Sequence, residues 1–212
     1  MRVCFACLML VVCSAVCSAP AAAQDAPVPT TPLVVSWPKL VVDVRGATGG
    51  VPSEAAFYPP LPEDTLVPAR GFGFDVGAHL YSGALGPARL GYGANVLVVR
   101  ATQSVTSAVT RLVAPQVSLN FGSPRGWSYV SGGVGFATVT GRFEDRAGLI
   151  DLEQGSGALL AYNVGAGARW FFLPRVAFTF DLRWHRYGAG GEGDAGTPAG
   201  SVGSASVGLS FR

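Results

Sequence analysis

The feature that most constrains the fold of this chain is a two-residue alternation of apolar and polar side chains over residues 160–187. In its second half, one parity carries Val176, Phe178, Phe180, Leu182 and Trp184, and the other carries Arg175, Ala177, Thr179, Asp181, Arg183, His185 and Tyr187. Successive side chains of a β-strand point to opposite faces, whereas an α-helix repeats every 3.6 residues. The stretch therefore predicts two strands joined by a tight turn at 173–175.

The same alternation recurs in other parts of the chain, at about 39–45, 71–80, 89–98, 113–121, 130–137 and 204–211. With the two strands of 160–187, this gives eight strands, each of about the 9–11 residues that a tilted membrane strand needs. The pattern predicts an all-β fold, an antiparallel up-and-down β-barrel of eight strands. Pro115 lacks the N–H that a closed barrel uses, so we expect a bulge there or a strand that begins at 116.

The composition indicates which face of the strands is inside. The chain has 29 glycines, 13% charged residues and a mean hydropathy of +0.37. Its polar parity is rich in glycine and other small residues, and a barrel of eight strands leaves an interior only just wide enough for side chains. We therefore expect the apolar face to meet lipid and the polar face to fill the interior of a transmembrane barrel.

Short and long connections alternate along the chain, which is typical of outer-membrane barrels. Short turns then lie on the periplasmic side with both chain ends, and the longer loops are extracellular. Five apolar residues are expected to form a girdle at the periplasmic end: Phe121, Trp170, Phe172, Leu209 and Phe211. After the first segment no apolar stretch approaches the roughly 20 residues of a membrane helix, so a helical membrane protein is excluded.

The start of the chain resembles an export signal in its physical layout. Arg2 precedes an apolar run that ends in small residues at Ala21, Ala22 and Ala23, which predicts a signal peptide at 1–23. We expect a Pro-rich periplasmic segment at 24–36, the barrel at 37–212, and a location in the bacterial outer membrane. All four cysteines precede residue 23, so no disulfide or cysteine metal site is expected in the mature chain.

Two stretches carry a resemblance to a known family. The segment NVGAGARWFFLPRVAFTFDLRWHRY, residues 163–187, is similar to the penultimate hairpin of the OmpA-like and OmpX-like eight-stranded outer-membrane β-barrel domains. The ending ASVGLSFR resembles the C-terminal signal of such barrels, displaced by one residue because Arg212 follows Phe211. The resemblance implies recognition of the last strand by the barrel-assembly machinery. It does not indicate an activity.

Five arginines share the lipid-facing parity near the predicted extracellular strand ends: Arg70, Arg100, Arg111, Arg142 and Arg186. The planar guanidinium group suits phosphate oxygens, so this set could bind the phosphorylated head of lipopolysaccharide. Alternatively, these side chains are simply solvated. Outer-membrane lipid and lipopolysaccharide are the expected partners, and the chain is expected to be a monomer.

A second polar set has the interior parity: Lys39, Asp43, Arg45, Asp75, His79, Arg89, Arg169, Asp181, Arg183 and His185. It could form a path for protons or ions. The favoured interpretation is a network of salt bridges and hydrogen bonds that makes the interior solid, because buried charges need partners. A wide pore is not expected in so narrow a barrel.

The sequence favours a protein that is not an enzyme and binds no cofactor. The two histidines, His79 and His185, have no serine two residues away on their own strands, and the nearest aspartates are four residues away, about 13 Å along a strand. The GxGxxG pattern at 188–193 is followed by no helix, so it does not predict nucleotide binding. A formal net charge of +2 without a basic cluster gives no sign of a nucleic-acid partner.

These observations predict a structural, surface-exposed outer-membrane barrel without catalysis. Two alternatives remain at this stage. One is a soluble periplasmic ligand-binding barrel of the lipocalin type, which needs an apolar and hollow interior. The other is an outer-membrane enzyme that modifies lipid A, which needs a histidine and a serine close together on a surface that lipid can reach.

Overall fold

The computed structural model describes residues 36–188 and 198–212 of the chain. The predicted signal peptide and nearly all of the Pro-rich segment lie outside the described residues. The elements are β1 (Leu40–Gly50), the 3-10 helix η2 (Ala55–Phe57), β2 (Arg70–Leu85), β3 (Ala88–Gln103), β4 (Thr106–Ser123), β5 (Gly126–Glu144), β6 (Asp151–Gly155), β7 (Leu159–Phe171), β8 (Val176–Tyr187) and β9 (Gly200–Phe211). Within this described part, no helix is long and apolar enough to cross a membrane.

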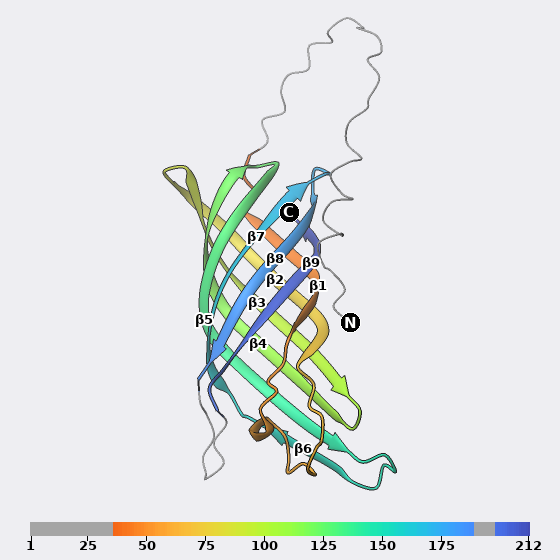
Figure 1. The fold of residues 1–212 in the computed structure, drawn as a ribbon. Helices are drawn as coiled ribbons and strands as arrows, with labels where there is room; N and C mark the ends of the chain where they lie inside the picture. The colour runs from red at the N-terminus through yellow and green to blue at the C-terminus, as the bar shows by residue number, and fades with distance from the viewer. Residues whose placement is uncertain (1–35, 189–197) are drawn as a thin grey trace, which may run out of the picture. The chain divides into compact units, whose positions relative to one another are not determined.

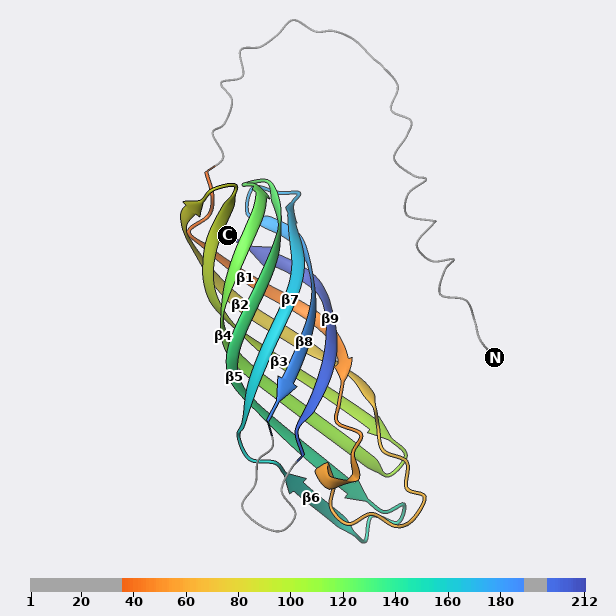
Figure 2. The same cartoon turned by 60° about the vertical axis from the view of Figure 1, so that its left-hand side comes forward.

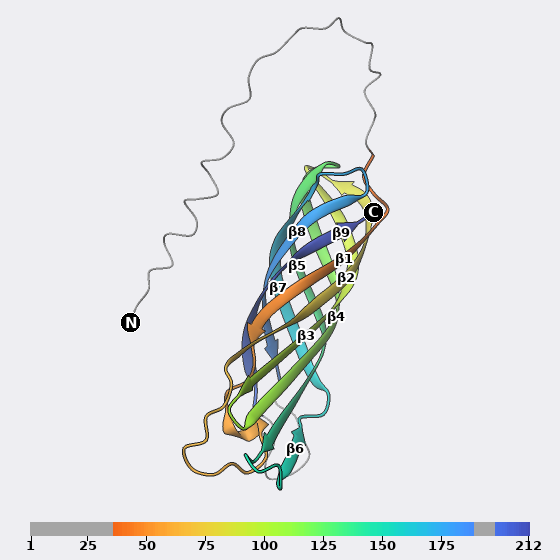
Figure 3. The same cartoon turned by 90° about the vertical axis from the view of Figure 1, so that its right-hand side faces the viewer.

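Eight of the strands close into a ring in which every neighbouring pair is antiparallel (Figure 1). The first strand closes the ring, because β1 pairs with β2 on one side and with β9 on the other. Figure 3 shows β1 between these two partners. The contacts between β1 and β9 run from the Val42–Phe211 pair to the Gly49–Ser204 pair. The predicted eight-stranded antiparallel barrel is confirmed.

A short additional strand, β6, lies outside the ring. The first part of β5 pairs with β7 over residues 126–137, and its last part pairs with β6 over residues 140–144. Figure 2 shows this hairpin extending beyond the end of the ring. The alternation gave no sign of β6, because a strand without a buried face need not alternate.

The strands of the ring contain 11 to 19 residues, so the expected length of 9–11 is too short for most of them. The longest, β4 and β5, have 18 and 19 residues. Backbone pairing continues beyond the apolar belt, where outward side chains no longer need to be apolar. The apolar alternation marks only the central part of each strand.

The two ends of the barrel differ in their connections. At one end, here called the turn end, the strands are joined by residues 86–87, 124–125 and 172–175. At the opposite loop end lie the long connection 51–69, the β5–β6 hairpin and the connection after β8. The link between β3 and β4 is also at the loop end but contains only Ser104 and Val105, shorter than expected.

Exposure along the strands follows the predicted parity. Leu182 is 57% exposed and Val44 is 50% exposed, whereas Thr179 and Asp43 on the opposite parity are fully buried. Large apolar side chains therefore cover the outside of the barrel, and polar side chains lie inside. This is the arrangement expected of a barrel surrounded by lipid, because the hydrocarbon region favours an outer belt made mainly of apolar side chains.

Pro115 lies inside β4, with neither the bulge nor the late strand start that was expected. The pairs Val113–Phe136 and Gln116–Gly133 keep the same register with β5, and Pro115 pairs with Ala94 on the other side. A Cβ atom on Gly133 would lie 2.3 Å from the Pro115 carbonyl oxygen. Glycine in β5 therefore lets the two backbones approach closely, and the proline is accommodated without a register shift.

Candidate functional site

The interior of the barrel is organised around Asp43 of β1. Its carboxylate accepts a hydrogen bond from Arg169 Nε at 2.9 Å, a second from Arg169 Nη2, and one from the Ser210 hydroxyl. His79 Nε2 lies 3.2 Å from Asp43 Oδ2. Four strands, β1, β2, β7 and β9, thus contribute to one buried contact that links opposite parts of the ring.

A second group of contacts continues from Arg45, two residues further along β1. Its Nη2 lies 3.0 Å from Asp75 Oδ2, and its Nη1 donates to the Tyr129 hydroxyl at 3.1 Å. Tyr129 in turn donates to Asp181 Oδ2 at 2.8 Å, and Ser206 donates to Asp75 at 3.1 Å. The tyrosine therefore connects the carboxylate of β8 to the guanidinium of β1.

Arg183 completes the network on the β7–β8 side. It forms two hydrogen bonds to Asp181, at 3.1 and 3.0 Å, and further bonds to Gln116, Asn163 and Ser131 at 2.6, 2.5 and 2.9 Å. Buried charges are tolerated when they are paired and hydrogen-bonded. Here three arginines meet three aspartates, so the formal charges of the network cancel.

Eight of the ten residues expected inside are buried: Asp43, Arg45, Asp75, His79, Arg169, Asp181, Arg183 and His185. Lys39 is a correction, because it precedes β1 and is exposed. Arg89 is half-buried at the turn end, where its guanidinium lies 5.1 Å from the Trp37 ring centroid. Its position next to a turn lets the long side chain reach solvent.

Neutral partners of the network were missed by the sequence reasoning, which looked for charges. Gln116, Ser131, Asn163, Ser206 and Ser210 share the interior parity of their strands and are buried. Extending the parity to uncharged hydrogen-bonding residues would have found them. Tyr129 was missed because the predicted strand started one residue too late.

Aromatic side chains close the interior at the turn end. The Trp127 ring lies 4.8 Å from Trp37, 5.5 Å from Tyr81 and 5.3 Å from Phe171, measured between centroids. Arg169 lies beneath this cluster, 4.5 Å from the Tyr129 ring centroid. The buried charges are thus separated from this end of the barrel by an apolar layer.

The interior toward the loop end is apolar, which differs from the uniformly polar interior that was expected. Leu97, Val99, Leu112 and Val139 are buried there. The run VLVV at 96–99 indicates this apolar interior in the sequence, because four consecutive apolar residues place apolar side chains on both faces of a strand. Small and apolar side chains leave room here for residues from outside the ring.

The β1–β2 connection fills that space. Phe57 and Tyr58 are 2% and 3% exposed and pack in the same apolar cluster. The Phe57 ring meets Tyr187 edge-on with centroids 6.0 Å apart, and the Tyr58 hydroxyl donates to the Pro52 carbonyl at 3.0 Å. Burial, together with the nearby Glu54 carboxylate, raises the pKa of Tyr58 to about 12. The polar network therefore lies between two apolar layers.

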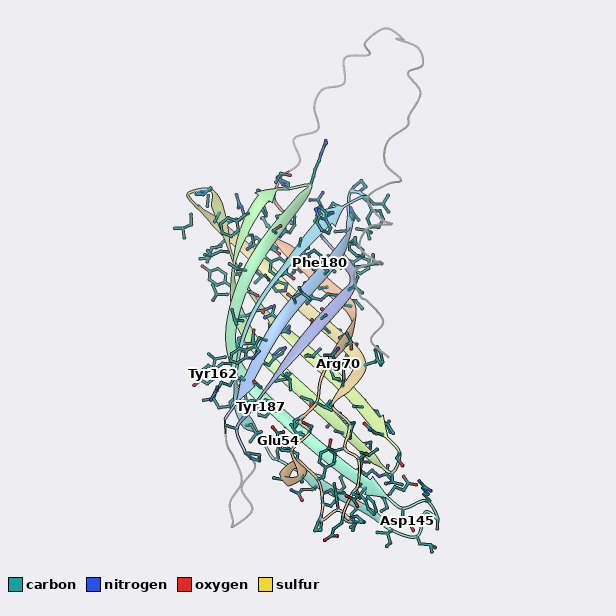
Figure 4. All side chains as sticks on the ribbon, viewed as in Figure 1. Glu54, Arg70, Asp145, Tyr162, Phe180 and Tyr187 are labelled. Carbon is teal, nitrogen blue, oxygen red and sulfur yellow. The ribbon has the colours of Figure 1, made fainter. Side chains whose placement is uncertain are left out.

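Of the five outward arginines, four are exposed: Arg70, Arg100, Arg111 and Arg186. Arg142 is different, because its Nε donates to Asp151 at 2.6 Å and its Nη2 lies 3.6 Å from Glu144. Figure 4 places Arg70 beside the barrel wall and Asp145, after β5, at the far loop end. The five side chains therefore do not form one ring of equivalent cations.

Two depressions occur near these arginines. One, of about 410 Å³, is lined by Arg100, Arg142 and Arg146 together with Glu144. The other, of about 310 Å³, lies where the β1–β9 ladder ends and is lined by Thr48, Gly49, Gly50, Ala69, Arg70, Gly203, Ser204 and Ala205. Ser204 Oγ in this second depression lies 3.1 Å from His185 Nε2. The sequence reasoning compared His185 only with serines of its own strand, and the contact comes from the neighbouring strand.

Comparison with known proteins gave matches in structure only. No protein-family model and no curated protein matches the chain. The Neisserial surface protein A superposes with a TM-score of 0.51 at 11% identity, covering 82% of this chain and 97% of that one. The Yersinia pestis attachment invasion locus protein Ail gives a TM-score of 0.46 at 15% identity, covering 81% and 96%. The N-terminal barrel domain of Pseudomonas aeruginosa OprF gives 0.37 at 14% identity, covering 82% and 96%.

The first of these matches agrees with the features described above. It spans nearly the whole of the surface protein and most of this chain. The ring of eight antiparallel strands, the apolar outside and the polar centre of the interior belong to that architecture. This chain therefore has the fold of the eight-stranded outer-membrane β-barrel proteins, as its resemblance to OmpA-like and OmpX-like barrels indicated.

Proposed function

We propose that this protein is a surface-exposed barrel of the bacterial outer membrane, with its loop end outside the cell. The observation that carries the proposal is the belt of outward apolar side chains around a closed ring of eight strands. A soluble ligand-binding barrel would instead hide its apolar side chains around a hollow interior. Here the centre of the interior is occupied by paired charges and both ends are filled by aromatic side chains.

The outward arginines give this barrel a means of contact with lipopolysaccharide. Arg70, Arg100 and Arg111 come from three consecutive strands, and the pairs Phe72–Arg100 and Val98–Arg111 bring them to neighbouring positions on the wall. None of the three forms an ion pair within residues 36–188 and 198–212. Exposed guanidinium groups at the edge of an apolar belt are well placed to donate hydrogen bonds to lipid phosphates.

Membrane insertion is tested by fractionation and by heat-modifiable migration of the protein in detergent gels. We expect the protein to pellet with outer membranes and to migrate faster before boiling. Recovery in the soluble periplasmic fraction would contradict the proposed location.

Lipopolysaccharide contact is tested by a variant in which Arg70, Arg100 and Arg111 are replaced by Gln. A matched control replaces Lys39, Arg125 and Arg175, three exposed cations at the turn end. Binding of purified lipopolysaccharide to the refolded barrels is then compared, with dephosphorylated lipid A as a second ligand. We expect weaker binding for the first variant only, and only for the phosphorylated lipid. Equal binding by both variants would exclude the arginine contact.

A further inference from the structure

His185 and Ser204 form a contact that the interior network does not use. Their Nε2 and Oγ atoms lie 3.1 Å apart, on β8 and β9. The antiparallel register produces the contact, because Arg183 pairs with Ser204 and His185 pairs with Val202 on the same interior parity. Serine is activated as a nucleophile when a histidine lies within hydrogen-bond reach of its hydroxyl, about 2.6–3.2 Å. The observed distance lies in this range.

The serine is the more accessible member of the pair. His185 is only 2% exposed, whereas Ser204 is half-buried and lines the depression of about 310 Å³ in the wall. The β1–β9 ladder ends at the Gly49–Ser204 pair, so residues 200–203 of β9 pair only with β8. A Cβ atom on Gly203 would meet nothing within 4 Å. Ser204 therefore contacts His185 and also lines the depression where the β1–β9 ladder ends.

The depression lies at the loop-side edge of the apolar belt. Gly203 pairs with Trp184, which is 44% exposed, and Thr48 pairs with Phe72, which is 79% exposed. Tryptophan and tyrosine side chains are enriched at the interface between the apolar and polar regions of a membrane, where Trp184 is well suited to lie. The ester carbonyl groups of membrane lipids lie at this interface, between acyl chains and head groups. Arg70 lines the same depression and offers hydrogen-bond donors to an anionic head group.

We propose that Ser204 and His185 are the nucleophile and the general base of an acyl-ester hydrolase site for an anionic membrane lipid. Ser204 Oγ attacks the acyl carbonyl carbon while its proton passes to His185 Nε2. The ester carbon–oxygen bond then breaks, and His185 returns the proton to the departing alkoxide, which leaves as an alcohol. Water attacks the acyl-serine and gives a proton to His185, the fatty acid departs, and Ser204 recovers its proton from His185.

The pair acts without a carboxylate. Within the described residues, the interior aspartates Asp43, Asp75 and Asp181 are engaged by arginines, and the hydrogen-bond partner of His185 is Ser204. We expect slower turnover than in an enzyme with a complete nucleophile–histidine–carboxylate triad, because no third group orients the imidazole. A hydrolase site differs from the expectation from the sequence that the chain is not an enzyme. His185 and Ser204 are the close histidine and serine that the lipid-modifying alternative requires.

The test uses the full barrel refolded in detergent micelles and a fluorophosphonate probe, which reacts with activated serines. We expect the probe to label Ser204, identified by peptide mass, and labelling to fall by about tenfold or more in Ser204→Ala and His185→Gln. Ser206→Ala is the matched control, because Ser206 lies on the same strand and face but donates to Asp75. Heat-modifiable migration establishes that each variant is folded. Labelling that is absent, or equal in Ser204→Ala, overturns the proposal.

A second measurement follows the substrate. Release of free fatty acid is measured from vesicles that contain an anionic diacyl phospholipid, and Gly203→Trp is used to fill the depression. We expect release by the native barrel, with loss in Gly203→Trp and in Ser204→Ala. No release from these vesicles would exclude an anionic phospholipid ester as the substrate. The inference rests on the proposed membrane location, but serine labelling in detergent does not depend on that location or on lipopolysaccharide binding. The two proposals can therefore fail separately.

Discussion

Asp43 and Arg169, which are 126 positions apart in the sequence, form a fully buried ion pair in the centre of the barrel. Removing one partner of such a pair leaves an uncompensated buried charge, which typically costs about 3–5 kcal/mol. We expect Asp43→Ala to lower the free energy of unfolding by an amount in this range. Urea unfolding in lipid vesicles, followed by heat-modifiable migration, measures it.

The exposed Glu63→Ala in the β1–β2 connection serves as the control for that measurement, since surface substitutions change stability by about 0.5 kcal/mol or less. If Asp43→Ala unfolded at the same urea concentration as Glu63→Ala, the interior pair would contribute nothing to stability.

Gly141 of β5 has no side chain, and this lets the β1–β2 connection pack directly against the β5 backbone. A Cβ atom there would lie 2.2 Å from the Phe57 carbonyl oxygen and 2.9 Å from Tyr58 Cδ1. We expect Gly141→Ala to displace Phe57 and Tyr58 from the barrel mouth and to make the connection easier to cleave. A protease that cuts after glutamate, acting at Glu54 and Glu63, reports this change.

Gly155 on the neighbouring strand β6 provides the control, because a Cβ atom there would meet nothing within 4 Å. Gly155→Ala should leave the cleavage rate unchanged. Equal rates for both variants and the native barrel would show that the connection is not seated against Gly141.

Single cysteines in β8 test which face meets lipid. The native cysteines all precede residue 23, within the predicted signal peptide. We expect Leu182→Cys, on the exposed parity, to react with a lipid-soluble maleimide in intact membranes. Thr179→Cys, on the buried parity, should remain unlabelled until the barrel is unfolded. The reverse labelling would place the apolar side chains inside.

The β5–β6 hairpin is expected to respond to pH through Arg142 and Asp151. The hydrogen bond from Arg142 lowers the pKa of the Asp151 carboxyl below its ordinary value of 3.8. Because the folded pKa is depressed, the stabilisation is complete above 3.8 and is lost as the pH falls through the lowered value. Both groups are exposed, so the effect is small and is weakened by salt.

Amide hydrogen exchange at Leu152 and Gln154, which pair with β5, measures the opening of this hairpin. We expect faster opening, corrected for intrinsic exchange, at the acidic end of the range. In Asp151→Asn the opening should not depend on the titration of this carboxyl. A native hairpin with the same opening equilibrium at every pH would contradict the prediction.

Features with a regular local pattern could be read from the sequence. The alternation in 174–187 identified β8 and its outward apolar side, and it placed Asp181, Arg183 and His185 inside the barrel. The same reasoning could not say which aspartate meets which arginine. Asp43 lies closer to Arg169 of β7 than to Arg45 of its own strand. The strands β1 and β7 are in different parts of the ring, and their side chains meet across the interior.

The alternation also disappears where both faces of a strand have a similar environment. The strand β6 has no buried face, and the loop-end interior holds Leu97 and Val99 opposite a connection whose position no local pattern encodes. Phe57 and Tyr58 are seated there because the apolar interior and Gly141 together leave space for them.

By itself, the sequence determined the class of fold, the number of strands in the ring and the side of each strand that faces outward. These follow from a period of two residues, which is a property of each strand separately. The tertiary structure decided the partners: Arg169 with Asp43, Phe57 with Tyr187, and His185 with Ser204. Such contacts depend on register and on ring closure, which bring together residues from separate strands, and no local spacing in the chain records them.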